Sequence, residues 1–273
     1  MEHLAQVNGK KAFYWTAGDA TKPAVVFLHG FPGNHQGMLW LANFFVDDYF
    51  VIMPDFPGCG QSEGLGKNHG IESHAEWLND FLQTISVAKP VIIGHSFGAR
   101  VATYFAAHYP DSISAVVLLT PVVRIAGFWG RLATSGFNLA KLMPIRMQKR
   151  YLSNAPYQHF AFWLAFKSDD KETRSEIVRQ SLAEVKKLDP KIHLEMLDDL
   201  YAHDLEKWGK SIAVPCLLIA GMKDDIVSVA SVESFMINMK NAKLEVMENT
   251  GHLLPIEHPE FTAKTIKTWL CNL

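Results

Sequence analysis

A serine stands in the middle of the pentapeptide Gly94-His95-Ser96-Phe97-Gly98, between an apolar run at 91–93 and a helix-like segment at 100–107. A strand that turns sharply into a helix raises its central residue above the sheet, and glycines two positions to either side leave room for the turn. The pattern therefore predicts a nucleophile elbow that presents the hydroxyl of Ser96. Because the pentapeptide alone is common, the flanking strand and helix signals carry this prediction.

A serine hydroxyl is a weak nucleophile until a base removes its proton, so Ser96 requires a histidine nearby. Among the twelve histidines of the chain, His252 is the candidate. It follows the last strand-like run, in a loop introduced by Gly251, and such a loop opens at the same sheet edge as the elbow.

The histidine in turn requires a carboxylate that fixes its tautomer and stabilises the imidazolium. Asp224 is the first carboxylate after the strand-like run at 216–220 and is the candidate for this acid. Asp225 is the second candidate for the acid, and Glu248 is a weaker third candidate.

Attack by a serine on a carbonyl group places negative charge on an oxygen, which preorganised N–H donors stabilise. One donor is expected to be the backbone N–H of Phe97, where the helix dipole also favours an anion. The other is expected from the loop at 29–33, where Phe31 is the candidate because Pro32 has no N–H. His29 is expected to hold this loop rather than to act in catalysis.

Strand-like runs alternate with helix-like segments, which predicts an α/β fold with a mostly parallel sheet and helices on both faces. The two N-terminal runs are predicted to form an antiparallel edge, a crossover helix is expected at 71–85, and a terminal helix at 259–273. The strand-like runs are 11–15, 24–28, 49–53, 91–93, 115–119, 216–220 and 244–247.

The alternation breaks between Pro121 and about Val214, where helical patterns replace strand-like runs. This predicts an all-helical cap insertion at 122–209, over a core formed by 1–121 and 210–273. Asp169 with Glu172 resembles a capping box at the start of one of its helices. A few of its aromatic side chains are expected to contact substrate; the set is Phe128, Trp129, Phe137, Tyr151, Tyr157, Phe160, Phe162, Trp163 and Phe166.

The 273-residue chain has 48% hydrophobic and 20% charged residues, as in an ordinary globular protein. A net charge of −2 gives no reason to expect nucleic acid or an anionic membrane as a partner, so a small molecule is the expected ligand. No apolar run approaches the ~18 residues that span a bilayer, and the first residues lack the apolar region of a secretory signal. Cys59, Cys216 and Cys271 have no metal-ligand spacing and predict reduced thiols, hence a cytoplasmic location. A homodimer is left open.

Taken together, the motifs resemble those of the α/β-hydrolase superfamily. The loop at 29–33 resembles its oxyanion motif, 55–62 resembles its loop after the fourth strand, and 221–224 resembles its acid turn. The chain order Ser96, Asp224, His252 is the family's order. The resemblance covers the whole chain except the insertion, which stands where the family carries its cap. It implies an eight-stranded sheet.

The resemblance also implies a serine hydrolase of the carboxylesterase kind, which acts on a small-molecule ester through an acyl-enzyme and needs no metal or organic cofactor. A serine rather than an aspartate nucleophile argues against the haloalkane dehalogenases and epoxide hydrolases. One alternative is a carbon–carbon bond hydrolase or a lyase-type synthase. Arg100 matches a position of the menaquinone-pathway synthases, although packing or pairing on its own helix is its expected role. A non-enzymatic, ligand-binding member of the fold is the second alternative.

Overall fold

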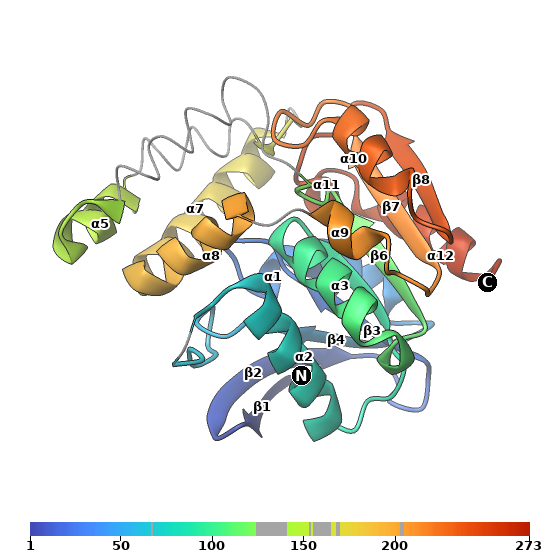
Figure 1. The fold of residues 1–273 in the computed structure, drawn as a ribbon, viewed down its shortest axis with the longest axis horizontal. Coiled ribbons are helices and arrows are strands. Elements are labelled where there is room, and N and C mark those ends of the chain that lie inside the picture. Colours follow the sequence, from blue (N-terminus) through green and yellow to red (C-terminus); the bar gives the residue numbers. More distant parts are fainter. Residues whose placement is uncertain (67, 124–140, 153, 155–164, 168–169, 203–204) are drawn as a thin grey trace.

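The computed structural model describes residues 1–66, 68–123, 141–152, 154, 165–167, 170–202 and 205–273. Within these residues eight strands form one sheet, in the order β1-β2-β4-β3-β5-β6-β7-β8 (Figure 1). β2 is antiparallel to both of its neighbours, and all other neighbouring strands are parallel. The predicted α/β fold is confirmed. The strands are β1 (Glu2–Val7), β2 (Lys10–Ala17), β3 (Ala24–Leu28), β4 (Phe50–Pro54), β5 (Val91–His95), β6 (Ala115–Leu119), β7 (Cys216–Gly221) and β8 (Ala242–Met247).

The N-terminal edge of the sheet differs from the prediction. The antiparallel edge consists of β1 and β2, and β1 was not among the expected strands. The sequence pattern predicts the run Ala24–Leu28 at this edge, but the run is β3 and lies in parallel between β4 and β5. Its last four side chains are fully buried, as expected for an interior strand. β1 is mostly exposed or half-buried, so it lacks the apolar run that marks a strand in the sequence.

Helices cover both faces of the sheet, and alternate residues of β3 pack against opposite layers. Val26 and Leu28 belong to the core beneath α2 (Ile71–Thr84) and α3 (Phe97–His108), whereas Val25 and Phe27 belong to the core beneath α1 (Gln36–Ala42) and α12 (Pro259–Leu270). The predicted crossover and terminal helices are thus present. The remaining short elements of the core are η1 (Asn43–Phe45), η2 (Pro110–Ser112), α10 (Val229–Met236) and α11 (Leu254–Glu257).

Between β6 and β7 the described residues form α5 (Ile145–Leu152), α7 (Lys171–Lys187), α8 (Pro190–Ala202) and α9 (Leu205–Gly209). α7 begins after Asp170, whose carboxylate accepts hydrogen bonds from the amides of Glu172 and Thr173; the expected cap, Asp169, lies outside the described residues. α9 packs on α3, where Trp208 meets Tyr104 edge to face at 4.9 Å. The division into core and cap stays a prediction. No helix in the described part of the chain is long and apolar enough to cross a bilayer.

Candidate active site

Ser96 lies at the turn from β5 into α3, where its backbone adopts φ 52° and ψ −111°. A positive φ strains a residue that has a side chain, and such strain is typical of functional positions. There is no room for a side chain at either flanking glycine. A Cβ on Gly94 would lie 2.4 Å from the carbonyl oxygen of Gly98, and a Cβ on Gly98 would lie 2.4 Å from the carbonyl oxygen of Leu28. The strand, turn and helix expected around Ser96 are therefore all present, pressed against the end of β3.

Ser96, His252 and Asp224 lie together at the carboxyl ends of β5, β8 and β7. The Nε2 atom of His252 is 2.9 Å from Oγ of Ser96, and its Nδ1 atom is 2.8 Å from Oδ2 of Asp224. The exposed fractions of the three residues are 8%, 4% and 9%. A buried line of hydrogen bonds thus joins a carboxylate, an imidazole and a hydroxyl, and a proton can move from Ser96 to His252 within it.

Asp224 is held as an ionised carboxylate. Burial alone would raise its pKa, but the charge and hydrogen bond of His252, together with the amides of Val227 and Ile226, hold the pKa below its ordinary value. The second candidate, Asp225, instead forms an ion pair with Lys167, with 2.6 Å between Oδ2 and Nζ. Of the three carboxylates considered for this role, only Asp224 contacts His252 in the described part of the chain.

The predicted oxyanion residues lie beside Ser96. Gly30 packs so closely that a Cβ on it would lie 3.3 Å from Cβ of Ser96. The next residue, Phe31, places its ring 6.1 Å from the ring of Phe97. Among the described residues, nothing accepts a hydrogen bond from the amide of Phe31 or of Phe97. Both amides therefore stay candidates for the oxyanion donors.

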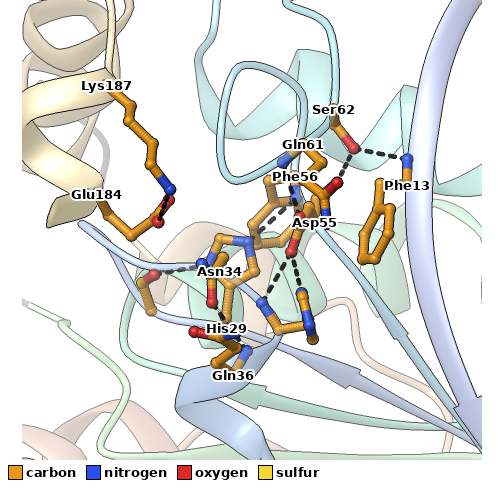
Figure 2. Close-up of polar contacts among 12 residues, drawn as sticks. Phe13, His29, Asn34, Gln36, Asp55, Phe56, Gln61, Ser62, Glu184 and Lys187 are labelled. Carbon is orange, nitrogen blue, oxygen red and sulfur yellow. Dashed lines mark hydrogen bonds and ion pairs between the residues drawn. The ribbon is translucent and has the colours of Figure 1, made fainter. Parts of the chain in front are cut away.

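His29 holds the oxyanion loop, as expected. Its Nε2 atom accepts a hydrogen bond from the amide of Phe56 at 3.0 Å, so its Nδ1 atom carries the proton and donates to the carbonyl oxygen of Gly30 at 2.8 Å (Figure 2). Burial lowers the pKa of His29, although Asp55 opposes the shift, and the ring stays neutral at pH 7. The loops after β3 and β4 are thereby tied together.

Asp55, which the sequence placed only within a loop motif, is a second tie between these loops. Its Oδ1 atom accepts hydrogen bonds from both N and Nδ1 of His35 at 2.8 Å, and its Oδ2 atom accepts from the amide of Gln61 at 2.9 Å (Figure 2). Gly60 passes so close that a Cβ on it would lie 2.0 Å from Oδ2. A buried carboxylate with several donors is stable only in one loop arrangement.

A small pocket of ≈ 40 Å³ lies between these loops and α7, where Figure 2 shows Glu184 and Lys187. Its volume suits about one water molecule. Neither Ser96 nor His252 lines it, so it is separate from the serine. The lining residues are Pro32, Gly33, Gly58, Cys59, Gly60, Glu184, Lys187 and Leu188.

One residue near the site, His193, carries no signal in the sequence. His193 of α8 packs edge-on against the ring of Phe31 at 4.9 Å, and burial lowers its pKa to about 4. Arg100 is buried, which agrees with the expected packing, but it donates a hydrogen bond to the carbonyl oxygen of Val122, which lies after β6 and not on the helix of Arg100. Of the nine aromatic residues expected over the site, only the half-buried Tyr151 and the buried Phe166 are described; the other seven, between 128 and 163, lie outside the described residues.

Comparison with known proteins places this geometry in context. A family model described as alpha/beta hydrolase fold matches residues 23–259, which include Ser96, Asp224 and His252. Human monoacylglycerol lipase ABHD6 is 23% identical over 270 residues, covering 92% of this chain and 76% of that protein. Lipase 1 of Psychrobacter immobilis is 25% identical over 283 residues, covering 98% and 83%. The solved structure of an esterase from Exiguobacterium antarcticum matches with a TM-score of 0.84 at 18% identity, covering 99% of each chain.

Proposed function

The chain belongs to the alpha/beta hydrolase fold family, and we propose that it is a serine hydrolase of carboxylic esters. The relatives named as lipases and an esterase support a hydrolase. The observation that carries the proposal is the unbroken pair of hydrogen bonds from Asp224 through His252 to Ser96. A buried hydroxyl with a strained backbone and a base in line is difficult to explain by stability alone.

In the first half of the reaction, Ser96 attacks the ester carbonyl carbon while Nε2 of His252 takes the hydroxyl proton. The carbonyl oxygen becomes an oxyanion and accepts hydrogen bonds from the amides of Phe31 and Phe97. His252 then passes its proton to the departing alkoxide, the carbon–oxygen bond breaks, and the alcohol leaves. Asp224 stabilises the imidazolium that exists between these two transfers.

In the second half, a water molecule attacks the acyl group on Ser96 while His252 takes a proton from it. The oxyanion forms again at the same two amides. Collapse of this intermediate releases the carboxylic acid, and His252 returns the proton to the serine oxygen. Every proton that moves is carried by one imidazole, so the cycle restores the starting site.

The acyl portion of the substrate is proposed to be apolar. The half-buried Phe31 follows Gly30, which packs against Ser96, and burial of apolar acyl atoms against an aromatic ring at this place is favourable; the ring of Phe97 is fully buried in the core. Two relatives that cover most of this chain are named as lipases, one of them for monoacylglycerol. An ester with an acyl chain rather than a charged acid is the substrate class that we propose.

The test is the hydrolysis rate of p-nitrophenyl esters of increasing acyl length, measured for the native protein and for Ser96→Ala. We expect an optimum length for the native protein and a loss of at least about 10⁴-fold in Ser96→Ala, because the nucleophile is removed. Ser114→Ala, on the exposed surface before β6, is the matched control and should retain full activity. Ser96→Ala with substantial turnover would refute the proposal.

Two other results distinguish the alternatives. Background rates on every ester, together with labelling of Ser96 by a fluorophosphonate, would favour a carbon–carbon bond hydrolase or lyase-type synthase with the same nucleophile. Absence of labelling in a folded protein would favour a non-enzymatic, ligand-binding member of the fold, because binding alone needs no activated serine.

A further inference from the structure

The backbone amide and the backbone carbonyl group of His252 are both hydrogen-bonded. Its amide nitrogen donates a hydrogen bond to the carbonyl oxygen of Ala165 at 2.8 Å. Its carbonyl oxygen accepts hydrogen bonds from Nε2 of His95 at 2.9 Å and from Oγ1 of Thr120 at 3.2 Å. Since Nδ1 and Nε2 also have partners, all four polar atoms of this residue are hydrogen-bonded. Ala165 differs from His95 and Thr120 because it lies within 122–209, the segment predicted as a cap, whereas those two belong to the predicted core.

Glu257 joins this segment to both neighbours of His252. Its Oε2 atom accepts hydrogen bonds from the amides of Gly251 and Lys167, each at 3.1 Å, and its Oε1 atom accepts from the amide of Leu253 at 3.2 Å. The residues immediately before and after His252 are therefore held by one carboxylate. The same carboxylate holds the chain two residues beyond Ala165.

Lys167 extends the connection to the acid. Its Nζ atom is 2.6 Å from Oδ2 of Asp225, the residue that follows Asp224. Close packing leaves little freedom here, because a Cβ on Gly251 would lie 2.6 Å from Cγ of Lys167 and 2.8 Å from the carbonyl oxygen of Ala165. Residues 165–167 therefore contact both the turn that carries Asp224 and the turn that carries His252.

We propose that residues 165–167 and Glu257 form a positioning bracket, which holds the ring of His252 between Ser96 and Asp224. This inference rests on the proposed function, in which His252 moves the protons. Residues 165–167 belong to the segment predicted as a cap. In this proposal that segment does more than cover substrate: it supplies the backbone acceptor and the cation that align the base with the acid.

The carboxyl group of Glu257 is partly removed from water where it accepts these hydrogen bonds. Burial raises its pKa, and the three amide hydrogen bonds oppose this only in part. A carboxyl group whose pKa is higher in the folded than in the unfolded state favours folding most at low pH, and that contribution is lost as the pH rises through the folded pKa. Ionisation of Glu257 is therefore less favourable in the folded than in the unfolded protein, and the three amide hydrogen bonds offset part of this difference.

The first variant is Glu257→Gln, assayed with the best p-nitrophenyl ester. In glutamine, an NH₂ group replaces one of the two carboxylate oxygens. That group cannot accept a hydrogen bond from a backbone N–H, so one side of the His252 turn would lose its acceptor. We expect kcat to fall roughly 10- to 100-fold with KM within twofold, because small displacements of a catalytic group cost rates of this size. The rate of fluorophosphonate labelling of Ser96 should fall in the same proportion, since labelling also needs His252.

The second variant removes only the cation. Lys167→Met should lower kcat roughly two- to fivefold, in keeping with a partly exposed ion pair, and Lys167→Arg should restore most of the rate. Matched controls are Glu260→Gln and Lys264→Met on the exposed side of α12, close to Glu257 in the chain. Both controls should match the native protein.

The outcomes separate three cases. The bracket is supported if Glu257→Gln lowers both kcat and the labelling rate, and if Lys167→Arg keeps most of the rate that Lys167→Met loses. If Glu257→Gln lowers the melting temperature but leaves kcat native, with kcat calculated from the number of serines that the probe labels, Glu257 is merely structural and the proposal is overturned. So would native rates in both Glu257→Gln and Lys167→Met. A native protein that is neither active on esters nor labelled would instead refute the proposed function.

Discussion

The turn that carries Ser96 is fixed by close packing of glycines against backbone atoms, whereas the turn that carries His252 is fixed mainly by hydrogen bonds to its backbone. At the serine, close packing around Gly94 and Gly98 fixes the backbone. At the histidine, the backbone is fixed by the carbonyl oxygen of Ala165 and the ring of His95. A turn of the first kind leaves a motif in the sequence, because only glycine fits. A turn of the second kind leaves almost none, because any residue can supply a carbonyl oxygen.

The largest expected effect separates the two neighbouring aspartates on the histidine side. Asp224→Asn should lower kcat about 10⁴-fold, because an amide stabilises the wrong tautomer of His252 and cannot stabilise an imidazolium. Asp225→Asn should lower kcat only about as much as Lys167→Met, since both remove one partly exposed ion pair. The measurement is steady-state hydrolysis of the best ester, with folding checked by circular dichroism. Comparable losses in the two variants would contradict the assignment of the acid.

The second prediction compares an alanine substitution in each turn. Gly98→Ala should destabilise the protein by about 3 kcal/mol or more, because the new methyl group meets two backbone oxygens of the sheet. Gly251→Ala should cost about 1–2 kcal/mol, because part of its clash is with the flexible Lys167 side chain, yet its kcat should fall as in Glu257→Gln. Urea unfolding measures the first quantity and ester hydrolysis the second. Equal destabilisation by both substitutions would remove the distinction between the turns.

The third prediction concerns pH. Asp55, on the serine side, and Asp224, on the histidine side, both have pKa values held below the ordinary range, Asp55 chiefly because hydrogen bonds and His35 outweigh the effect of burial. A carboxylate with a depressed folded-state pKa contributes stability that is present above the unfolded pKa of about 4 and is lost as the pH falls through the folded pKa. We expect Asp55→Asn and Asp224→Asn to be less stable than the native protein by on the order of 1–3 kcal/mol at pH 7. The deficit should shrink in urea titrations at pH 3, and a deficit that grows there would contradict the assigned ionisation.

The smallest expected effect concerns which cysteine thiols react with an alkylating reagent. Cys59 is buried, its Sγ atom contacts the sulfur of Met196 in α8 at 4.0 Å, and burial raises the pKa of its thiol. Iodoacetamide should therefore modify the exposed Cys271 of the native protein and leave Cys59 unmodified, with activity unchanged. Peptide mass mapping gives the sites. Modification of Cys59 in native conditions would indicate that α8 separates from the core, and Glu257→Gln is the variant in which to look for it.

The sequence predicted the sheet and the three hydrogen-bonded residues because both depend on residue types with strong local signals. Buried parallel strands require apolar runs, and the turn at Ser96 requires glycine. β1 was missed because its side chains face solvent, and Ala24–Leu28 was misassigned because an interior strand and an edge strand differ mainly in their neighbours. The contact of Glu257 with Lys167 and that of His193 with Phe31 are long-range and depend on how the segment between β6 and β7 packs. Cytoplasmic location and dimerisation stay predictions.

The carbonyl oxygen of Ala165 has a consequence for how this chain can be re-engineered. Ser96 precedes the segment between β6 and β7, while Asp224 and His252 follow it, so that segment resembles an exchangeable module that a designer would replace to alter substrate choice. The hydrogen bond from His252 to Ala165 makes such a graft conditional. A transplanted module must bring a backbone oxygen back to the same point, whatever its own sequence, or the host loses a restraint on its base.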